Sequence, residues 1–399
     1  MSNIKYLKLR FPEFTGEWEV RKLGELIKVN MCKRIFSNQT ASIGEVPFYK
    51  IGTLGDKADS YISRELFEEY KDKYNYPRKG EILITCSGTV GKTVIYDGRD
   101  SYYQDSNIVW LNNDNKIICN SIIKIIISRI DWNRKLNSTT ITRLYNDDIR
   151  SLIIEFPTEK EEQQKIGDFF MLLDKRIEQQ EQKIALLKDY KKGMMQKIFS
   201  QKIRFKDENG NDYPDWEEKK LGEIVYRNSK KNKDQKYTLI QSISNKYGFV
   251  NQEDYFEDRR VGSLDVSNYY VINNGCFAYN PSRIDVGSLA YKNDNDISII
   301  SPLYVSFKGN AKHINDKFLL GWLFSHKFVG KLGRLFEGSV RNTLSYENLS
   351  TIDIETPCIA EQEKIALFLE VINDSIENQK ELLDEIIKEK TALLNKMFI

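Results

Sequence analysis

The chain has 399 residues, of which 40% are hydrophobic, 12% aromatic and 30% charged, and this composition excludes disorder as its main state. Its 60 lysines and arginines nearly balance its 58 aspartates and glutamates, so net charge alone neither requires nor excludes a nucleic-acid partner. No apolar run reaches the ~18–20 residues that cross a bilayer, and the first residues lack the apolar core of a secretion signal. We therefore expect a cytoplasmic protein with two to four domains and no membrane partner.

Cysteine and histidine spacing excludes several kinds of site. The five cysteines all lie far apart, and the two histidines, His313 and His326, are 13 positions apart. Zinc, iron–sulfur and redox sites use closely spaced cysteines, and a two-histidine site on one helix needs a spacing of four. We expect reduced thiols, no metal bound by this chain and no histidine-based catalysis.

The beginning of the chain recurs about 200 residues later. Residues 18–26, WEVRKLGEL, match residues 216–224, WEEKKLGEI, and the preceding pieces 8–11 and 202–205 are also alike. Further on, EQQKI at 162–166 matches EQEKI at 361–365, and QKIF at 196–199 matches NKMF at 395–398. The chain is therefore predicted to be two copies of one unit of about 200 residues.

Each copy is predicted to be a mixed lobe followed by a long helix. The lobes, residues 1–157 and 201–357, are rich in Tyr, Ile, Val and Phe, interrupted by Gly, Asn and Asp, which is typical of short strands and turns with a few helices. Residues 158–200 and 358–399 are rich in Glu, Gln, Lys, Ile and Leu, which predicts helices about 60 Å long.

A heptad pattern in both helices predicts coiled-coil packing. Two seam positions per heptad are apolar in eight of ten places in each helix. The seam of the first helix is Ile166, Phe170, Leu173, Ile177, Gln180, Ile184, Leu187, Lys191, Met194 and Ile198, and adding 199 gives the seam of the second. The polar exceptions, Gln180, Lys191, Gln379 and Lys390, either set the register of the pair or reach out to solvent.

Connectivity determines the direction of this pair. The first helix leaves lobe one for lobe two, and the second can only return, so paired helices must be antiparallel. The predicted fold is α+β, with two pseudo-symmetric mixed α/β lobes separated by an antiparallel two-helix coiled coil. Ile399 should then lie close to Met1.

Two related lobes on a rigid spacer suit a ligand with a repeat, and B-DNA presents one face every ~34 Å. Residues 1–157 carry 24 basic and 20 acidic residues and residues 201–357 carry 22 and 21, whereas residues 358–399 carry 5 and 9. The closest basic cluster is Arg227, Lys230, Lys231, Lys233 and Lys236. Such groups provide affinity for phosphates without sequence preference, so we expect DNA on the lobes.

These features together resemble one known family. The openings W-x-x-x-K-L-G-E at Trp18 and Trp216, the helix starts E-Q-x-K-I, Gly80-Glu-Ile-Leu-Ile-Thr, Ser301-Pro-Leu-Tyr-Val and the stretches 138–157 and 338–357 are similar to the specificity subunit of type I restriction–modification enzymes. The resemblance covers essentially the whole chain. It implies a noncatalytic subunit whose lobes are target-recognition domains, each reading one half of a split, asymmetric site on double-stranded DNA.

The same resemblance implies partners and binding residues. The helices would set the unread gap and dock two methyltransferase (M) subunits, and restriction/translocase (R) subunits would join them. S-adenosylmethionine, ATP and Mg would be bound by those partners, and this chain would bind no cofactor. Loop residues with side chains suited to DNA would approach the groove: Thr53, Ser87, Thr89, Lys92, Gln104 and Arg143 in lobe one, and Lys230, Lys231, Ser244, Lys246, Asn280, Ser282, Arg283, Arg341 and Asn342 in lobe two.

Three local strings mimic catalytic motifs but lack essential residues. Residues 88–93, GTVGKT, end like a phosphate-binding loop, but Cys86 stands where that loop needs glycine. Residues 280–283, NPSR, depart from the Asn-Pro-Pro-aromatic motif of amino-methyltransferases at the third and fourth positions. Residues 214–219, PDWEEK, are spaced too tightly for nuclease carboxylates that share a metal.

Two hypotheses of different classes follow. In the first, the chain is a sequence-specific DNA-binding subunit. A refinement of this hypothesis, suggested by the low net charge, is that the chain binds DNA poorly alone and gains affinity only with its methyltransferase subunits. In the second, it is a coiled-coil scaffold whose lobes bind proteins rather than DNA. Salt-dependent, sequence-selective binding to duplex DNA discriminates between them.

Overall fold

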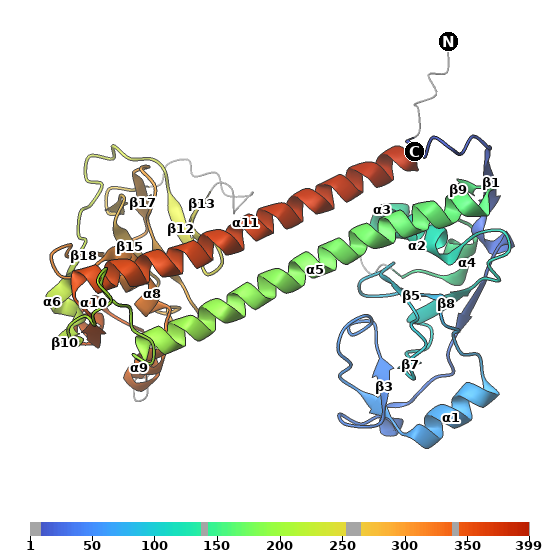
Figure 1. Ribbon diagram of the computed structural model, residues 1–399, viewed down its shortest axis with the longest axis horizontal. Coiled ribbons are helices and arrows are strands. Elements are labelled where there is room, and N and C mark those ends of the chain that lie inside the picture. Colours follow the sequence, from blue (N-terminus) through green and yellow to red (C-terminus); the bar gives the residue numbers. More distant parts are fainter. Residues whose placement is uncertain (1–8, 137–142, 253–264, 337–342, 399) are drawn as a thin grey trace, which may run out of the picture. The chain divides into compact units, whose positions relative to one another are not determined.

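The computed structural model describes residues 9–136, 143–252, 265–336 and 343–398, and the chain forms two compact units (Figure 1). Unit 1 contains residues 1–181 and 382–399, and unit 2 contains residues 182–381. Each unit therefore includes one lobe and parts of both long helices, α5 (Lys160–Phe199) and α11 (Ile359–Met397). No helix in the described part of the chain is long and apolar enough to cross a membrane.

The lobe of unit 1 contains three small sheets. β1 (Trp18–Lys22) pairs antiparallel with β9 (Ile153–Pro157). A four-stranded antiparallel sheet has the order β2 (Lys28–Met31), β8 (Ile108–Asn112), β5 (Ile82–Thr85) and β6 (Thr93–Ile95). The third sheet has the order β4 (Tyr61–Ile62), β3 (Val46–Tyr49) and β7 (Tyr102–Tyr103). The short helices are η1 (Leu23–Glu25), η2 (Ser37–Gln39), α1 (Arg64–Lys73), α2 (Asn120–Ser128), α3 (Trp132–Lys135) and α4 (Asn146–Arg150).

Local sequence explains these elements. The four residues of β5 are all buried, as expected for an aliphatic run in a strand covered on both faces. Helix α1 begins after Ser63, whose hydroxyl accepts a hydrogen bond from Leu66 N at 3.2 Å and satisfies an amide that a helix start leaves free. Strand β8 is buried in four of its five positions, so β5 and β8 form the centre of the lobe.

The lobe of unit 2 repeats this arrangement. β10 (Glu217–Lys220) pairs antiparallel with β19 (Asp353–Thr356). A four-stranded sheet has the order β11 (Val225–Arg227), β18 (Val305–Gly309), β15 (Cys276–Tyr279) and β16 (Leu289–Tyr291). Two further pairs are β12 (Gln241–Ser244) with β13 (Gly248–Asn251) and β14 (Tyr270–Ile272) with β17 (Ser298–Ile300). The short helices are α6 (Leu221–Ile224), α8 (Asp316–Leu323), α9 (His326–Phe336) and α10 (Tyr346–Ser350). The predicted α+β repeat is confirmed.

A buried glutamate explains the repeated opening and the repeated helix start. The fully buried Glu162 accepts hydrogen bonds from Arg10 Nε at 2.6 Å, Arg10 Nη2 at 2.7 Å and Trp18 Nε1 at 3.4 Å. In unit 2, Glu361 accepts from Arg204 Nη2 at 2.7 Å and from Trp216 Nε1 at 3.2 Å. A buried carboxylate is costly unless it is paired and hydrogen-bonded, so these residue types must recur together.

The glutamine that follows fastens the lobe to the helix. Gln163 Nε2 donates to Pro157 O at 2.7 Å, and Gln163 Oε1 accepts from Cys119 N at 2.7 Å. Gln362 makes the matching bonds: Nε2 donates to Pro357 O at 2.9 Å, and Oε1 accepts from Asn315 N at 2.8 Å. The E-Q pair therefore joins the end of the lobe, the start of α2 or α8, and the long helix.

The two long helices pack antiparallel within each unit, as predicted. In unit 1, Phe170 near the start of α5 shares a hydrophobic core with Met397 and Phe398 at the end of α11. In unit 2, Ile198 near the end of α5 shares a core with Ile365 near the start of α11. All twenty predicted seam positions are buried or half-buried, and all belong to the described part of the chain.

The polar seam residues lie inside the helix pair. Gln180 is buried, and Lys191, Gln379 and Lys390 are half-buried. Their role in setting the register stays a prediction.

The described ends of the chain meet in unit 1. Leu9 N donates to Lys396 O at 2.9 Å, whereas Met1 and Ile399 lie outside the described residues. We expect a circular permutant that begins near residue 201, with the native ends joined by a short linker, to fold with unchanged helix content, measured by circular dichroism. A matched permutant opened between Ile82 and Leu83 should not fold, because both residues are buried. An insoluble product from the first permutant would contradict the expected closure.

Candidate nucleic-acid interface

The loop after β5 is held in a defined shape at one end of the central sheet of unit 1. Thr85 Oγ1 accepts from Lys92 N at 3.1 Å and donates to Thr89 O. Gly88 and Gly91 have φ values of +66° and +81°, which glycine adopts readily. Trp132 packs against Gly91 so closely that a Cβ there would lie 2.0 Å from the indole. The loop of residues 88–93, GTVGKT, is therefore held by hydrogen bonds to Thr85 and packs against Trp132.

Ser87, Gln104 and Arg143 lie where three segments of lobe one meet. Ser87 Oγ donates to Asn107 Oδ1 at 2.9 Å, and Arg143 Nη2 donates to Ser106 O at 3.3 Å. The side-chain oxygen of Gln104 is enclosed and has no hydrogen-bond partner among the described residues. Gln104 therefore presents its oxygen to the protein interior rather than to the open surface.

Thr89 and Lys92 are exposed at the rim of the same loop. Lys92 Nζ lies 3.9 Å from the position that a Cβ on Gly55 would occupy, so the turn that contains Thr53 adjoins this loop. Thr53 is half-buried, and its hydroxyl donates to Lys50 O at 3.3 Å. The structure thus brings the six lobe-one candidates onto adjoining segments: 50–55, 86–92, 104–107 and 143.

In lobe two, five of the candidates lie on two loops that touch: Ser244, Lys246, Asn280, Ser282 and Arg283. Asn280 Oδ1 accepts from Ser282 N at 3.0 Å, which leaves Ser282 and Arg283 exposed. Asn245, in the turn between β12 and β13, donates through Nδ2 to Val286 O at 2.8 Å. The hairpin turn and the loop after β15 therefore form one surface.

The hairpin turn carries Ser244 and Lys246. Ser244 Oγ accepts from Lys246 N at 3.2 Å, and the Lys246 ammonium lies 4.8 Å from the centre of the Tyr247 ring. Lys246 is exposed, and Ser244 is half-buried. Arg341 and Asn342 lie outside the described residues.

The loop after β5 and the loop after β15 occupy corresponding places in the repeat. Leu144 N donates to Cys86 O at 2.8 Å, and Leu344 N donates to Pro281 O at 2.9 Å. Each bond joins the loop after the third strand of the four-stranded sheet to the segment before the last short helix. Loops 86–92 and 280–288 therefore correspond in position but differ in side chains.

Lys230 and Lys231 lie at a separate place in unit 2. A cleft of about 480 Å³ is lined by Arg227, Lys230 and Lys308, all cationic, together with polar neighbours. Lys231 Nζ donates to Asn268 Oδ1 at 3.4 Å. The structure therefore does not bring these two lysines onto the surface formed by the hairpin turn and the loop after β15.

A buried lysine that sequence reasoning missed supports the hairpin. Lys292 is 1% exposed, donates to Gln241 Oε1 at 3.0 Å and pairs with Asp294 at 2.8 Å. Gln241 also accepts from Ser298 Oγ at 2.7 Å and donates to Asn251 Oδ1 at 3.0 Å. This network ties β12 and β13 to the rest of the lobe. Nothing in the local sequence distinguishes Lys292 from a surface lysine.

Cys86, in the loop after β5, is poorly placed to act as a nucleophile. Burial raises the pKa of the Cys86 thiol to about 11, and the nearby Arg143 only partly opposes this shift, so the thiol stays protonated at neutral pH. In the described part of the chain, no three His, Cys, Asp or Glu side chains are grouped so that they could hold a metal.

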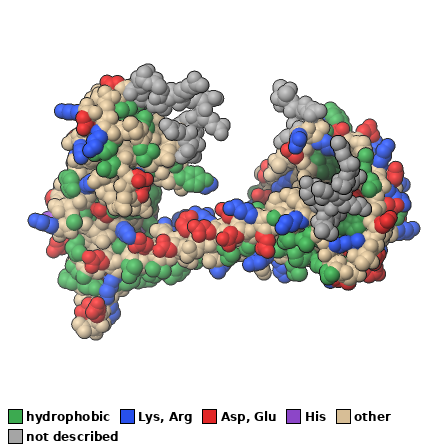
Figure 2. All heavy atoms as spheres, turned by 90° about the horizontal axis from the view of Figure 1, so that it is seen from above, with side chains coloured by type: hydrophobic (Ala, Val, Ile, Leu, Met, Phe, Trp, Pro, Cys, Tyr) green, Lys and Arg blue, Asp and Glu red, His purple; other side chains and the backbone are tan. Residues whose placement is uncertain are grey.

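Charge is distributed in patches rather than as one basic field. On the face seen in Figure 2, acidic and basic side chains alternate along the helices and over the lobes. Within unit 1, Asp174 of α5 pairs with Lys390 of α11 and, at 3.3 Å, with Lys124. The seam lysine of this unit therefore has a carboxylate partner.

Comparison with known proteins identifies the family. The profile described as "Type I restriction modification DNA specificity domain" matches residues 15–189 and again residues 213–388. A putative type I restriction enzyme specificity subunit of Haemophilus influenzae is 50% identical over 157 residues, which span 39% of this chain and 40% of that protein. The putative MjaX specificity subunit of Methanocaldococcus jannaschii is 25% identical, covering 98% of this chain and 95% of that protein.

Solved structures agree in fold. The type I restriction–modification S subunit from M. genitalium superposes with a TM-score of 0.61 at 15% identity, covering 98% of both chains. A chain from a structure that concerns complex assembly and conformational transition of the type I restriction–modification system gives a TM-score of 0.55 at 14% identity. The match covers 97% of this chain and 98% of that one. Since both halves of the repeat match the same domain, the chain belongs to the specificity subunits of type I restriction–modification enzymes.

Proposed function

We propose that this subunit reads a bipartite, asymmetric site on double-stranded DNA, with one half-site contacted by each lobe. The observation that carries the proposal is the pair of corresponding loops. Loop 86–92 presents Thr89 and Lys92, whereas loop 280–288 presents Ser282 and Arg283 at the equivalent edge. Equivalent scaffolds with unlike hydrogen-bonding groups suit two different base sequences, because lysine and arginine pair with guanine and hydroxyls with several bases.

The chain would act without catalysing a reaction itself. We propose that two methyltransferase subunits dock on the helix pair, that restriction/translocase subunits join them, and that S-adenosylmethionine, ATP and Mg are bound by those partners in the cytoplasm. The helix pair would determine the length of the unread gap. The low net charge of the chain supports a role for partners in DNA affinity, because few phosphates can be neutralised by the lobes alone.

Salt-dependent DNA binding tests this proposal. We expect the chain, copurified with its partner subunits, to bind host-derived duplexes with an affinity that falls as salt rises and that depends on sequence. Lys246→Ala together with Arg283→Ala should weaken binding about tenfold or more, since a good base contact is worth about 1–3 kcal/mol. Lys388→Ala, which removes an exposed charge from α11, serves as the control.

Mapping DNA methylation in the host with and without this gene identifies the DNA sequence that the subunit recognises. A single split motif should disappear on deletion. Binding without sequence preference at any salt concentration, together with an unchanged methylome, would instead favour the scaffold whose lobes bind proteins.

A further inference from the structure

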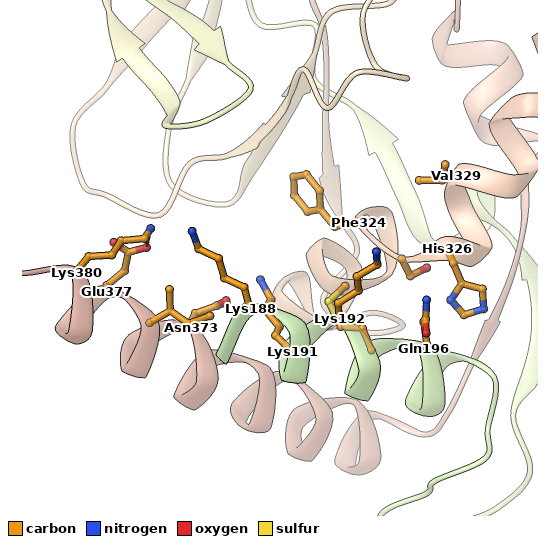
Figure 3. Close-up of a pocket in the computed structure, with 13 residues that line it drawn as sticks. Lys188, Lys191, Lys192, Gln196, Phe324, His326, Val329, Asn373, Glu377 and Lys380 are labelled. Carbon is orange, nitrogen blue, oxygen red and sulfur yellow. Dashed lines mark hydrogen bonds and ion pairs between the residues drawn. The ribbon is translucent and has the colours of Figure 1, made fainter. Parts of the chain in front are cut away.

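A groove lies within unit 2 between the helix pair and the turn that joins α8 to α9 (Figure 3). Its volume is about 570 Å³, within the range of small-molecule sites, roughly 300–1,000 Å³. α5 and α11 provide its charged side chains, and residues 324–329 provide most of the facing wall. The groove is remote in sequence from the recognition loops and plays no part in the proposed DNA reading.

The groove holds an excess of positive charge. Lys188, Lys191, Lys192 and Lys380 line it, together with the single carboxylate Glu377. Glu377 accepts from Lys380 Nζ at 2.7 Å, so this pair satisfies itself. In Figure 3 the ammonium groups of Lys188, Lys191 and Lys192 extend from α5 toward the wall that carries Phe324. These three lysines have no ion-pair or hydrogen-bond partner among the described residues.

Unit 1 provides an internal reference for Lys191. The repeat offset of 199 places Lys191 at the same seam position as Lys390, and Asn373 at the same position as Asp174. Lys390 pairs with Asp174. In unit 2 the amide of Asn373 replaces this carboxylate. Lys191 therefore occupies the same seam position as Lys390 but lacks the carboxylate that pairs with Lys390. Burial lowers the pKa of Lys191, and the neighbouring Lys380 lowers it further, whereas the carboxylate of Glu377 only partly opposes this shift.

The rest of the groove is apolar, with one unsatisfied hydroxyl. Met195 and Ile376 are buried lining residues, and Phe324 and Val329 are 49% and 54% exposed. Ser325 is 1% exposed, and its Oγ has no hydrogen-bond partner in the described structure. A buried hydroxyl without a partner is destabilising. A phosphate backbone would leave the apolar wall uncovered, so nucleic acid does not fit.

We propose that this groove binds a small organic carboxylate with an apolar body, whose carboxylate supplies to Lys191 the negative charge that Asp174 supplies to Lys390 in unit 1. The carboxylate pairs with Lys191, with Lys188 and Lys192 at its edge, and the apolar body covers Phe324 and Val329. No bond is made or broken. The proposal rests on the two compared lysine sites and is independent of which DNA sequence the lobes read.

The test is to titrate the full chain with 4-phenylbutyrate and to measure binding by isothermal titration calorimetry. Acetate has the same charge without the apolar body, and 4-phenylbutylamine has the same apolar body with the opposite charge. We expect phenylbutyrate to bind with one-to-one stoichiometry and at least tenfold more tightly than either control compound. Equal binding of the amine would overturn the proposal.

Two variants test the site itself. Asn373→Asp restores the carboxylate of unit 1, so it should raise the melting temperature of the free chain while weakening phenylbutyrate at least tenfold. Lys191→Met keeps an apolar seam and should weaken binding to the same degree. The matched control Asn395→Asp adds the same charge at an exposed position on α11 in unit 1 and should leave binding unchanged.

The outcomes separate the site from nonspecific binding and from protein docking. Undiminished phenylbutyrate affinity in Asn373→Asp would overturn the proposal. If the chain copurified with partner subunits no longer binds phenylbutyrate, an acidic side chain of a partner fills the groove and the small-molecule assignment is wrong. Retained binding in that complex supports a free organic acid.

Discussion

Exchange of residues 27–152 for the matching stretch of another specificity subunit is expected to change one half of the methylated DNA site and to leave the other half unchanged. All six lobe-one candidates fall inside this stretch, whereas the β1–β9 pair, the Arg10–Glu162 pair and both long helices remain. Specific sites are typically bound about 10³–10⁷ times more tightly than nonspecific DNA, so the original half-site should lose essentially all methylation.

The measurement is methylome sequencing of hosts that express each chimera. The reciprocal exchange of residues 225–349 provides the control, because it should change only the other half. Ile166, Phe170, Met397 and Phe398 pack against lobe one, so the donor stretch must present apolar side chains to them. An unchanged motif, or simultaneous change of both halves in a folded chimera, would contradict the assignment of one half-site to each lobe.

Glu361→Gln is expected to lower the free energy of unfolding of the chain by about 3 kcal/mol, since breaking a buried ion pair from one side costs about 3–5 kcal/mol. Glu361 is fully buried and holds both Arg204 and Trp216. Arg204 is 21% exposed and can regain some hydration, which places the effect at the lower end of the range. Urea denaturation monitored by tryptophan fluorescence measures it.

Two variants separate charge pairing from helix propensity. Glu363→Gln makes the same chemical change at an exposed position two residues away and should alter stability by less than about 0.5 kcal/mol. Glu162→Gln should reproduce the loss in unit 1. Equal stability of Glu361→Gln and Glu363→Gln would show that the buried pair does not hold the lobe to the helix.

The repeat and the helix pair could be predicted because both depend on patterns between residues close in sequence, namely short repeated motifs and heptad spacing. Heptad spacing places residues such as Ile166 and Phe170 on one face wherever the helix lies, and the chain path leaves only the antiparallel direction. The difference between Lys191 and Lys390 was also readable at offset 199, as Asn373 against Asp174, but only once the partner across the seam was known.

The sequence predicts which loops form the candidate interface, but it predicts less well where the individual side chains of those loops lie. Loop 86–92 follows the aliphatic run of β5, whereas loop 280–288 follows β15, whose residues are Cys, Phe, Ala and Tyr. The inward oxygen of Gln104 and the placement of Lys230 in another cleft depend on strand order. Strand order arises from contacts between segments far apart in the chain, such as β2 with β8. Lys292 escaped notice for the same reason, because its burial depends on β12 and β17 folding around it.

The core of unit 1 has a consequence for the order of synthesis. Met397 and Phe398 follow unit 2 in the chain but belong to the core of the lobe that precedes unit 2, and the ring centres of Phe398 and Trp18 lie 5.3 Å apart. Unit 2, residues 182–381, is complete before them. Domains usually fold from the N-terminus as they emerge from the ribosome. Here the lobe translated before unit 2 can complete its core only after unit 2 has been made, and a chain that stops short of Met397 leaves that lobe with an open apolar face.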